Sequence, residues 1–204
     1  MRPRRRLVAL LLAASTPFAL AACSDDGGHG DHMASSSIPE DEDFNQADVD
    51  FATDMIQHHA QALSMADLAD ERDLTPAMAE LVEQIRMAQG PEIESMVGWL
   101  ADWDQPVPET MRDHANAHGD GGSGMDADMP GMMSADEMER LEAAQDQDFE
   151  PLWLEMMIEH HEGAIDMADD EKSDGEHPDA IDLAENIIEA QKAEIEEMEQ
   201  LLAR

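Results

Sequence analysis

The chain has 204 residues, of which 49 are acidic and 11 basic, so its formal net charge is −38 at pH 7. A protein this acidic repels phosphates, which excludes nucleic acid as a partner, and its field raises the local concentration of cations. Aromatic residues are 3% of the chain and Met occurs 17 times; with few aromatic and β-branched residues, the composition favours helices over strands.

Residues 1–23 are typical of a targeting signal and are excluded from the fold. The basic segment MRPRRR precedes the apolar LVALLLAASTPFAL and then LAAC, which ends at Cys23. LAAC resembles a bacterial lipoprotein processing site, which implies cleavage before Cys23 and a lipid on its sulfur. We therefore expect a cell-membrane lipoprotein outside the cytoplasm, either periplasmic or on the outer face of the cytoplasmic membrane. The alternative is an ordinary secretory signal that leaves a free cysteine.

Two segments lack any apolar period. Residues 24–43 are rich in Gly, Ser and Asp and predict a flexible tether ahead of a domain at 44–204. The linker 104–134 carries several methionines and histidines. Flexible tracts of this kind either collect soft metal ions weakly or are ordinary disordered sequence.

The domain contains two copies of one sequence. Residues 48–100 and 150–202 align without a gap at a shift of 102, and 19 of 53 positions are identical. The segment MIQHHAQALSMAD of the first copy corresponds to MIEHHEGAIDMAD in the second. We interpret this match as an internal duplication.

Each copy predicts a helical hairpin. Thr75 before Pro76, and Pro178 in the second copy, mark helix starts, and Ser134 opens a capping box. Pro91 should kink the helix that contains it. Two hairpins with one apolar face each predict an all-α four-helix bundle. We expect helices at 46–71, 76–103, 135–171 and 178–203.

Both histidine pairs fall on an apolar helical stripe. At 100° per residue, Met55, His58 and His59 lie within one arc of the first helix, and Met65 lies at its edge. The second copy repeats this arc with Met157, His160, His161 and Met167. The opposite side of the first helix is predicted for Gln57, Ala60, Gln61 and Ser64.

The companion helix of each hairpin also points three side chains toward the interior or its edge: an amide, a carboxylate and a thioether. These side chains are placed to hold the imidazoles in one tautomer. They are Gln89, Glu92 and Met96 in the first copy and Gln191, Glu194 and Met198 in the second.

Four buried imidazoles need hydrogen-bond partners or a metal ion. Imidazole together with thioether suits copper, Cu(I) in particular, and silver, whereas zinc sites more often use thiolate or carboxylate. We therefore predict copper, as Cu(I) rather than Cu(II), bound by Met55, His58, His59, Met65, Met157, His160, His161 and Met167. The alternative is that these residues are core packing that duplication has preserved.

The sequence resembles the bacterial "domain of unknown function 305" family. The resemblance rests on Phe51-x3-Met55-Ile-x-His58-His59 and its counterpart from Trp153, on Gln-x2-Glu-Ile-x2-Met at 89–96 and 191–198, and on Pro130-Gly-Met-Met-Ser134. The family comprises ferritin-like four-helix bundles and includes CopM-type periplasmic copper-binding proteins. The resemblance implies such a bundle from about residue 44 onward, with soft-metal binding at the matched His and Met positions.

Three functions follow as hypotheses. The first is a lipid-anchored copper-binding protein that sequesters the metal or transfers it to a copper-handling partner. The second is a ferritin-like di-metal oxidase, although the Glu-x-x-His pairs of such sites are absent. The third is an envelope interaction module with a structural His/Met core. We predict no catalytic residues, and the sequence leaves open whether the hairpins pack within one chain or exchange in an oligomer.

Overall fold

The computed structural model describes residues 38–39, 41–70, 72–112 and 129–204. Within these ranges the chain forms five helices and no strand: α1 Gln46–Asp67, α2 Pro76–Asp102, α4 Ala135–Glu142, α5 Asp146–Asp174 and α6 Pro178–Leu202. None of the described helices is long and apolar enough to cross a membrane. The expected signal with Cys23, most of the tether and the middle of the linker lie outside the described residues.

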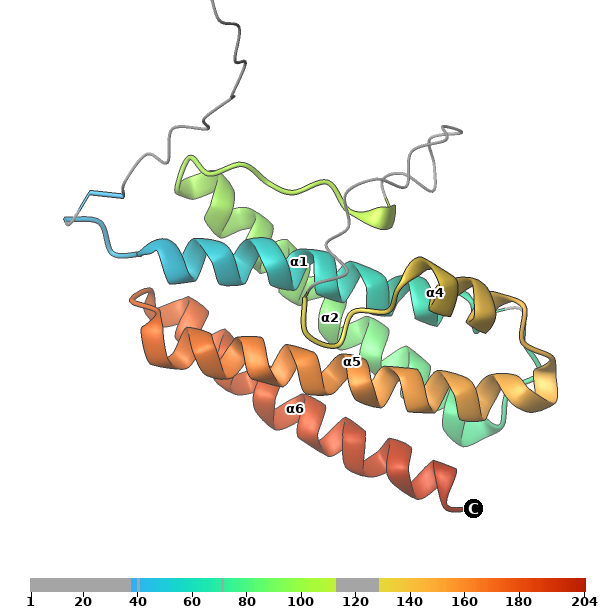
Figure 1. Ribbon diagram of the computed structural model, residues 1–204. Helices are drawn as coiled ribbons and strands as arrows, with labels where there is room; N and C mark the ends of the chain where they lie inside the picture. Colours follow the sequence, from blue (N-terminus) through green and yellow to red (C-terminus); the bar gives the residue numbers. More distant parts are fainter. Residues whose placement is uncertain (1–37, 40, 71, 113–128) are drawn as a thin grey trace, which may run out of the picture. The chain divides into compact units, whose positions relative to one another are not determined.

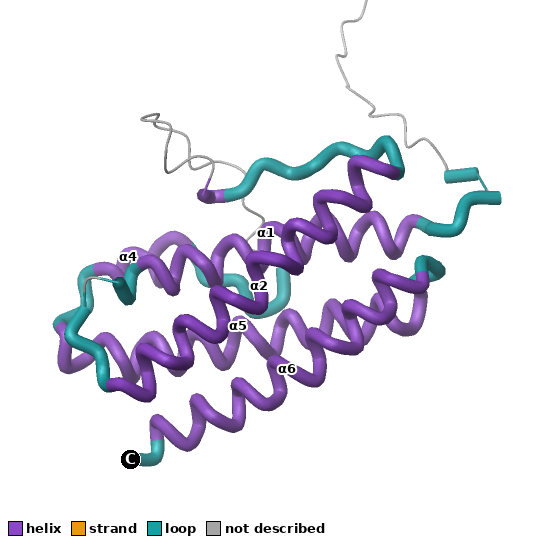
Figure 2. Tube along the Cα trace, turned by 180° about the vertical axis from the view of Figure 1, so that it is seen from behind, coloured by secondary structure: helices purple, strands orange, loops and turns teal. Residues whose placement is uncertain are grey.

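The four long helices form two antiparallel hairpins, α1 with α2 and α5 with α6 (Figures 1 and 2). The hairpins pack together through α1 against α5 and, over a smaller area, through α2 against α6. Each long helix therefore has two neighbours and turns one face toward a shared interior. The all-α bundle predicted from the sequence is confirmed.

Local signals account for the helix starts. The Thr75 side chain accepts a hydrogen bond from the Met78 amide, with Pro76 at the first helical position of α2. Ser134 and Glu137 form the expected capping box at α4. Helix α2 continues through Pro91.

The helix expected at 135–171 is instead two helices, α4 and α5. Arg72 donates hydrogen bonds to the Glu142 carbonyl at 2.6 Å and the Ala144 carbonyl at 2.8 Å, so these carbonyls at the end of α4 do not need helical partners. Gln145 is extended and marks the start of α5. Helix α5 then runs to Asp174, three residues beyond the expected end.

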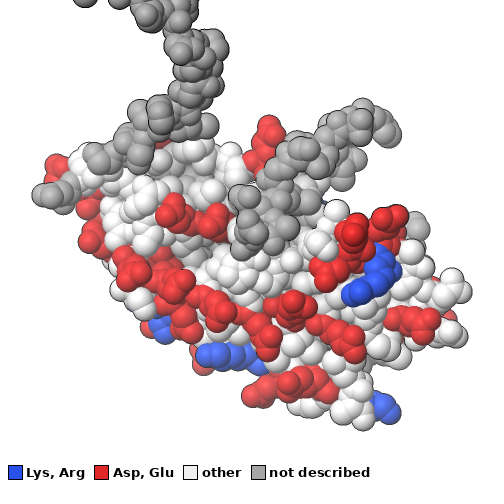
Figure 3. Space-filling view, viewed as in Figure 1, with Lys and Arg blue, Asp and Glu red and all other residues white. Residues whose placement is uncertain are grey.

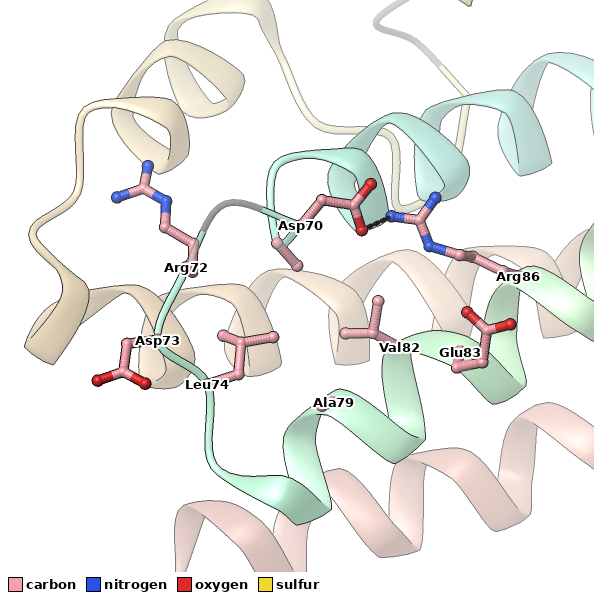
Figure 4. A pocket seen from close by; sticks show the side chains of 9 residues that line it. Asp70, Arg72, Asp73, Leu74, Ala79, Val82, Glu83 and Arg86 are labelled. Carbon is pink, nitrogen blue, oxygen red and sulfur yellow. Dashed lines mark hydrogen bonds and ion pairs between the residues drawn. The ribbon is translucent and has the colours of Figure 1, made fainter.

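Helix α1 ends at Asp67, before the expected residue 71. Arg86 of α2 donates to the Ala66 carbonyl at 2.6 Å and forms ion pairs with Asp67 and Asp70, the latter drawn in Figure 4. The same carbonyl also accepts from the Ala69 amide at 3.0 Å, so Arg86 adds a side-chain partner at this helix end.

The apolar core is divided into two clusters. One contains the largest buried rings, Trp153 and Phe149, and joins the second half of α1 to the first halves of α2 and α5. The other contains Phe51 and joins the first halves of α1 and α6 to the second halves of α2 and α5. The segments between the two clusters carry most of the buried polar residues; Asp48, in the first turn of α1, and Glu171, near the end of α5, lie elsewhere.

Candidate metal centre

Eight polar residues, two from each long helix, lie between the two apolar clusters; we call them the histidine layer. All four imidazoles have 0% of their surface exposed, and the two amides are 2% and 3% exposed. Helices α1 and α5 supply histidines, and α2 and α6 supply an amide and a carboxylate one turn apart, in the register that the duplication gives. The layer consists of His58, His59, Gln89, Glu92, His160, His161, Gln191 and Glu194.

The two central imidazoles lie against each other. The ring centroids of His58 and His160 are 3.7 Å apart, with 36° between the ring planes. His58 Nε2 is 3.0 Å from the Pro130 carbonyl oxygen. A carbonyl only accepts, so Nε2 carries the proton and Nδ1 of His58 keeps its lone pair.

The two outer imidazoles each face a carboxylate. His59 Nε2 lies 2.7 Å from Glu92 Oε2, and His161 Nε2 lies 2.7 Å from Glu194 Oε2. Because an ionised carboxylate only accepts, these contacts place a proton on Nε2, and Nδ1 of each ring has no hydrogen-bond partner. Histidines that ligate metals commonly donate their other ring N–H to a carboxylate in this way.

The layer contains unpartnered buried atoms in unusual number. Buried polar groups normally form hydrogen bonds, and each one left without a partner lowers the free energy of unfolding by about 1–3 kcal/mol. Among the described residues, the layer atoms without a hydrogen bond of good geometry are Nδ1 of all four histidines, Nε2 of His160, both amide atoms of Gln89 and Oε1 of Gln191. Imidazole lone pairs at the centre of this set fit a soft or borderline metal ion.

Burial keeps the central imidazoles neutral. Desolvation, followed by the nearby charge of His59, lowers the pKa of His58 to about 3. Desolvation, followed by His58, lowers the pKa of His160 well below its ordinary value. Since only a neutral imidazole can ligate a metal, neither ring has to lose a proton before binding at neutral pH.

Residues 129–134 form a strap across α1 and α5. Gln61 binds both backbone groups of Met133, at 2.7 and 2.8 Å. Gly131 has φ +72°. A Cβ at Gly163 would collide with the Pro130 carbonyl, so the backbone of the strap lies directly against the backbone of α5. The strap therefore lies directly over the His58 side of the layer.

The strap overturns one expectation. Gln61 and Ala60, placed by the sequence on the outer side of α1, are 0% and 1% exposed. A helix that the strap covers on its outer side is buried nearly all round, which the periodicity of that helix alone does not show. The roles of Pro130 and Gln61 were missed for this reason; the only signal was the Pro130-Gly-Met-Met-Ser134 motif itself.

The predicted methionines lie around the layer at different depths. Met55 lies in one apolar cluster and Met157 in the other, so the two copies place a thioether on opposite sides of the histidines. Met65, Met96 and Met198 are also fully buried. Met167 is half-buried and lines a surface groove instead.

No three His, Cys, Asp or Glu side chains among the described residues are gathered as ready-made metal ligands. The layer therefore brings the four imidazoles into one interior region without fixing a coordination geometry. Coordination of one ion by three or more of them requires the rings to turn.

A surface pocket of about 310 Å³ lies away from the layer, at the loop between α1 and α2 (Figure 4). Its two arginines are already engaged: Arg72 with carbonyls at the end of α4, and Arg86 with Asp67 and Asp70. The arginines of this pocket join helix ends, and we assign the functional site to the histidine layer.

Comparisons with known proteins agree with this fold. The structure is similar to a DUF305 fragment from Deinococcus radiodurans (TM-score 0.67, 30% identity, covering 80% of this chain and 99% of that one). It is also similar to a DUF305 protein from Streptomyces coelicolor (TM-score 0.65, 30% identity, 77% and 91%) and to CopM in the Cu(I)-bound form (TM-score 0.60, 29% identity, 76% and 94%). Structures of CopM with Cu(II) and with Ag match as well.

No curated protein matches the chain. The family described as "Domain of unknown function (DUF305)" matches residues 48–202, which include both copies of the duplication and the whole histidine layer. The chain therefore belongs to the DUF305 family.

Proposed function

We propose that the histidine layer binds copper, as Cu(I), with silver as a surrogate ion. The observation that carries this proposal is the presence of four fully buried imidazoles whose Nδ1 atoms all lack a partner. A core selected only for stability would not keep these unpaired nitrogens, because each lowers the free energy of unfolding. A bound ion uses these lone pairs and offsets that cost.

The donor types favour copper over harder metals. Imidazole nitrogens and nearby thioethers suit Cu(I), while Mg²⁺ and Ca²⁺ require oxygen cages. The likeness to CopM, whose structures contain Cu(I), Cu(II) and Ag, supports the same chemistry here. The two carboxylates of the layer each bind an imidazole Nε2–H. They thus stand apart, unlike the shared carboxylates of a di-iron oxidase.

The cellular role proposed is sequestration of copper, or its transfer to a copper-handling protein, outside the cytoplasm. The targeting signal and the lipidation of Cys23 that the sequence predicts support this location, as does the Streptomyces coelicolor relative, which is described as a "putative secreted protein". Membrane fractionation of cells that express Cys23→Ser tests the anchor. Retention of this variant in the membrane fraction contradicts lipidation at Cys23.

The metal proposal is tested by anaerobic titration of the purified protein with Cu(I) against a chromophoric chelator. The test variant carries His58→Ala, His59→Ala, His160→Ala and His161→Ala. The matched control is His177→Ala, which removes a histidine that precedes α6 and contacts Trp99 and Trp103 instead of the layer. Circular dichroism verifies that each variant is helical.

The expected result is tight binding in the wild type and in His177→Ala and its loss in the layer variant. Equal affinity in a folded layer variant, or no binding by the wild type, overturns the proposal. If the fourfold variant does not fold, His160→Leu replaces it, because this single change leaves no side-chain hydrogen-bond partner behind in the layer.

A further inference from the structure

The burial of the histidine layer sets a problem of access. A cation from solvent must cross the packed shell of the bundle, since the four imidazoles have no exposed surface. Of the eight layer residues, the two carboxylates are the ones that reach water, with side chains 17% exposed for Glu92 and 14% for Glu194. Each therefore touches both solvent and an imidazole.

The opposite approach, between α1 and α5, is covered. The strap holds Pro130 on His58, and Gln61 fastens Met133 with two hydrogen bonds. Gly131 and Gly163 bring the strap backbone into direct contact with α5. An ion entering from this side would have to break several buried hydrogen bonds, whereas a carboxylate can change partner at a half-open edge.

We propose that Glu92 and Glu194 are two equivalent access ports through which the cation reaches the layer, one in each hairpin. This inference rests on the proposed function of the layer. Glu92 of α2 meets His59 of α1, and Glu194 of α6 meets His161 of α5, so each port belongs to a single copy of the duplication.

The port works by ligand exchange. The exposed edge of the carboxylate takes the cation from water, and the imidazole behind it, whose Nδ1 has no hydrogen-bond partner, accepts the ion next. The unpartnered amide oxygens of Gln89 and Gln191 lie one helical turn away on the same helices. The His58 and His160 pair, which lies under the strap, is reached last.

The surrounding charge favours this route for cations. Figure 3 shows acidic side chains spread over the described face, with few basic ones among them. Such a field raises association rates of cations about 10-fold or more, and this effect weakens as salt increases.

The test compares the rate and the equilibrium of Cu(I) loading. Stopped-flow transfer of Cu(I) from a chromophoric chelator to the purified protein is followed for the wild type and for Glu92→Gln/Glu194→Gln. Glutamine keeps an oxygen that accepts from the imidazole Nε2–H, so the change removes mainly the charge. The matched control is Glu94→Gln/Glu196→Gln, the exposed carboxylates two residues further along the same helices.

The expected result is an association rate constant about 10-fold lower in the port variant, with the dissociation rate changed less, and near wild-type rates in the control. Equal slowing in the control would mean that only the general field matters. An unchanged association rate with faster dissociation would mean that the carboxylates only orient the imidazoles. Either outcome overturns the port, while wild-type binding would still support the proposed function.

Discussion

Replacing His160 with leucine should stabilise the metal-free protein, whereas the same change at His161 should destabilise it. Neither ring nitrogen of His160 makes a hydrogen bond of good geometry, so His160→Leu removes two unpaired polar atoms and leaves no side-chain partner behind. His161 instead holds Glu194 at 2.7 Å, and its removal leaves that carboxylate 14% exposed and unpaired. Adjacent residues of the same type thus have opposite predicted effects.

The magnitude follows from the unpaired atoms. Two orphaned nitrogens at about 1–3 kcal/mol each give a gross gain of roughly 2–6 kcal/mol. The lost ring contact with His58 and the imperfect fit of leucine reduce this gain in the free energy of unfolding by about 1–2 kcal/mol. A net gain of about 2 kcal/mol raises Tm by about 4–8 °C in a domain of this size. The loss for His161→Leu is about 1–3 kcal/mol.

The assay is urea and thermal unfolding followed by circular dichroism, with a strong copper chelator present so that no bound ion adds stability. The same variants are then titrated with Cu(I), where both should bind more weakly than the wild type. If His160→Leu is as destabilising as His161→Leu, the nitrogens of His160 are satisfied in the native state. The layer is then a structural network, and the reasoning from unpaired atoms fails.

Three further predictions concern pH and the strap. In the presence of chelator, the free energy of unfolding should fall as pH drops from about 6.5 toward 3. The reason is that burial lowers the pKa of His58 to about 3 in the folded protein, while the same group in the unfolded chain takes up a proton near pH 6.5. A urea-unfolding free energy that stays constant over this pH range contradicts the prediction. Burial and a neighbouring carboxylate, Asp48, raise the pKa of Glu171 to about 8, so its contribution to the free energy of unfolding is full below about pH 4.5 and is lost as pH rises through 8. Glu171→Gln should remove this slope between about pH 4.5 and 8 in the same urea-unfolding profile. Gly163→Ala should lower the free energy of unfolding by about 1–3 kcal/mol because the new Cβ meets the Pro130 carbonyl. The control Gly98→Ala, with open space around it, should raise the free energy of unfolding by about 0.5–1 kcal/mol. Equal shifts of Tm in the two variants would refute the strap contact.

The parts of the fold that the sequence predicts are those encoded locally or repeated. Thr75 and Ser134 carry capping signals that act within one turn of helix, and both helices begin where expected. The repeat placed the two histidine pairs in equivalent positions of the two hairpins. The roles of these residues as metal ligands remain predictions.

Contacts between distant segments account for what was missed. The ends of α1 and α4 depend on Arg86 and Arg72, which reach carbonyls about 20 and 70 residues away in the chain. The burial of Gln61 depends on the strap, 72 residues away. Local periodicity carries no information on such contacts, so it placed Gln61 on the outer side and joined α4 to α5.

The strap also breaks the symmetry that the duplication created. The outer pairs remain equivalent, since His59 with Glu92 and His161 with Glu194 show the same 2.7 Å contact. The central pair is not equivalent, because Pro130 binds His58 while His160 has no such partner. His58 is therefore held in one tautomer, but His160 can present either nitrogen and is the ring that can turn at the least cost. If an ion binds between the two central rings, the movement that completes its coordination should occur at His160 of α5.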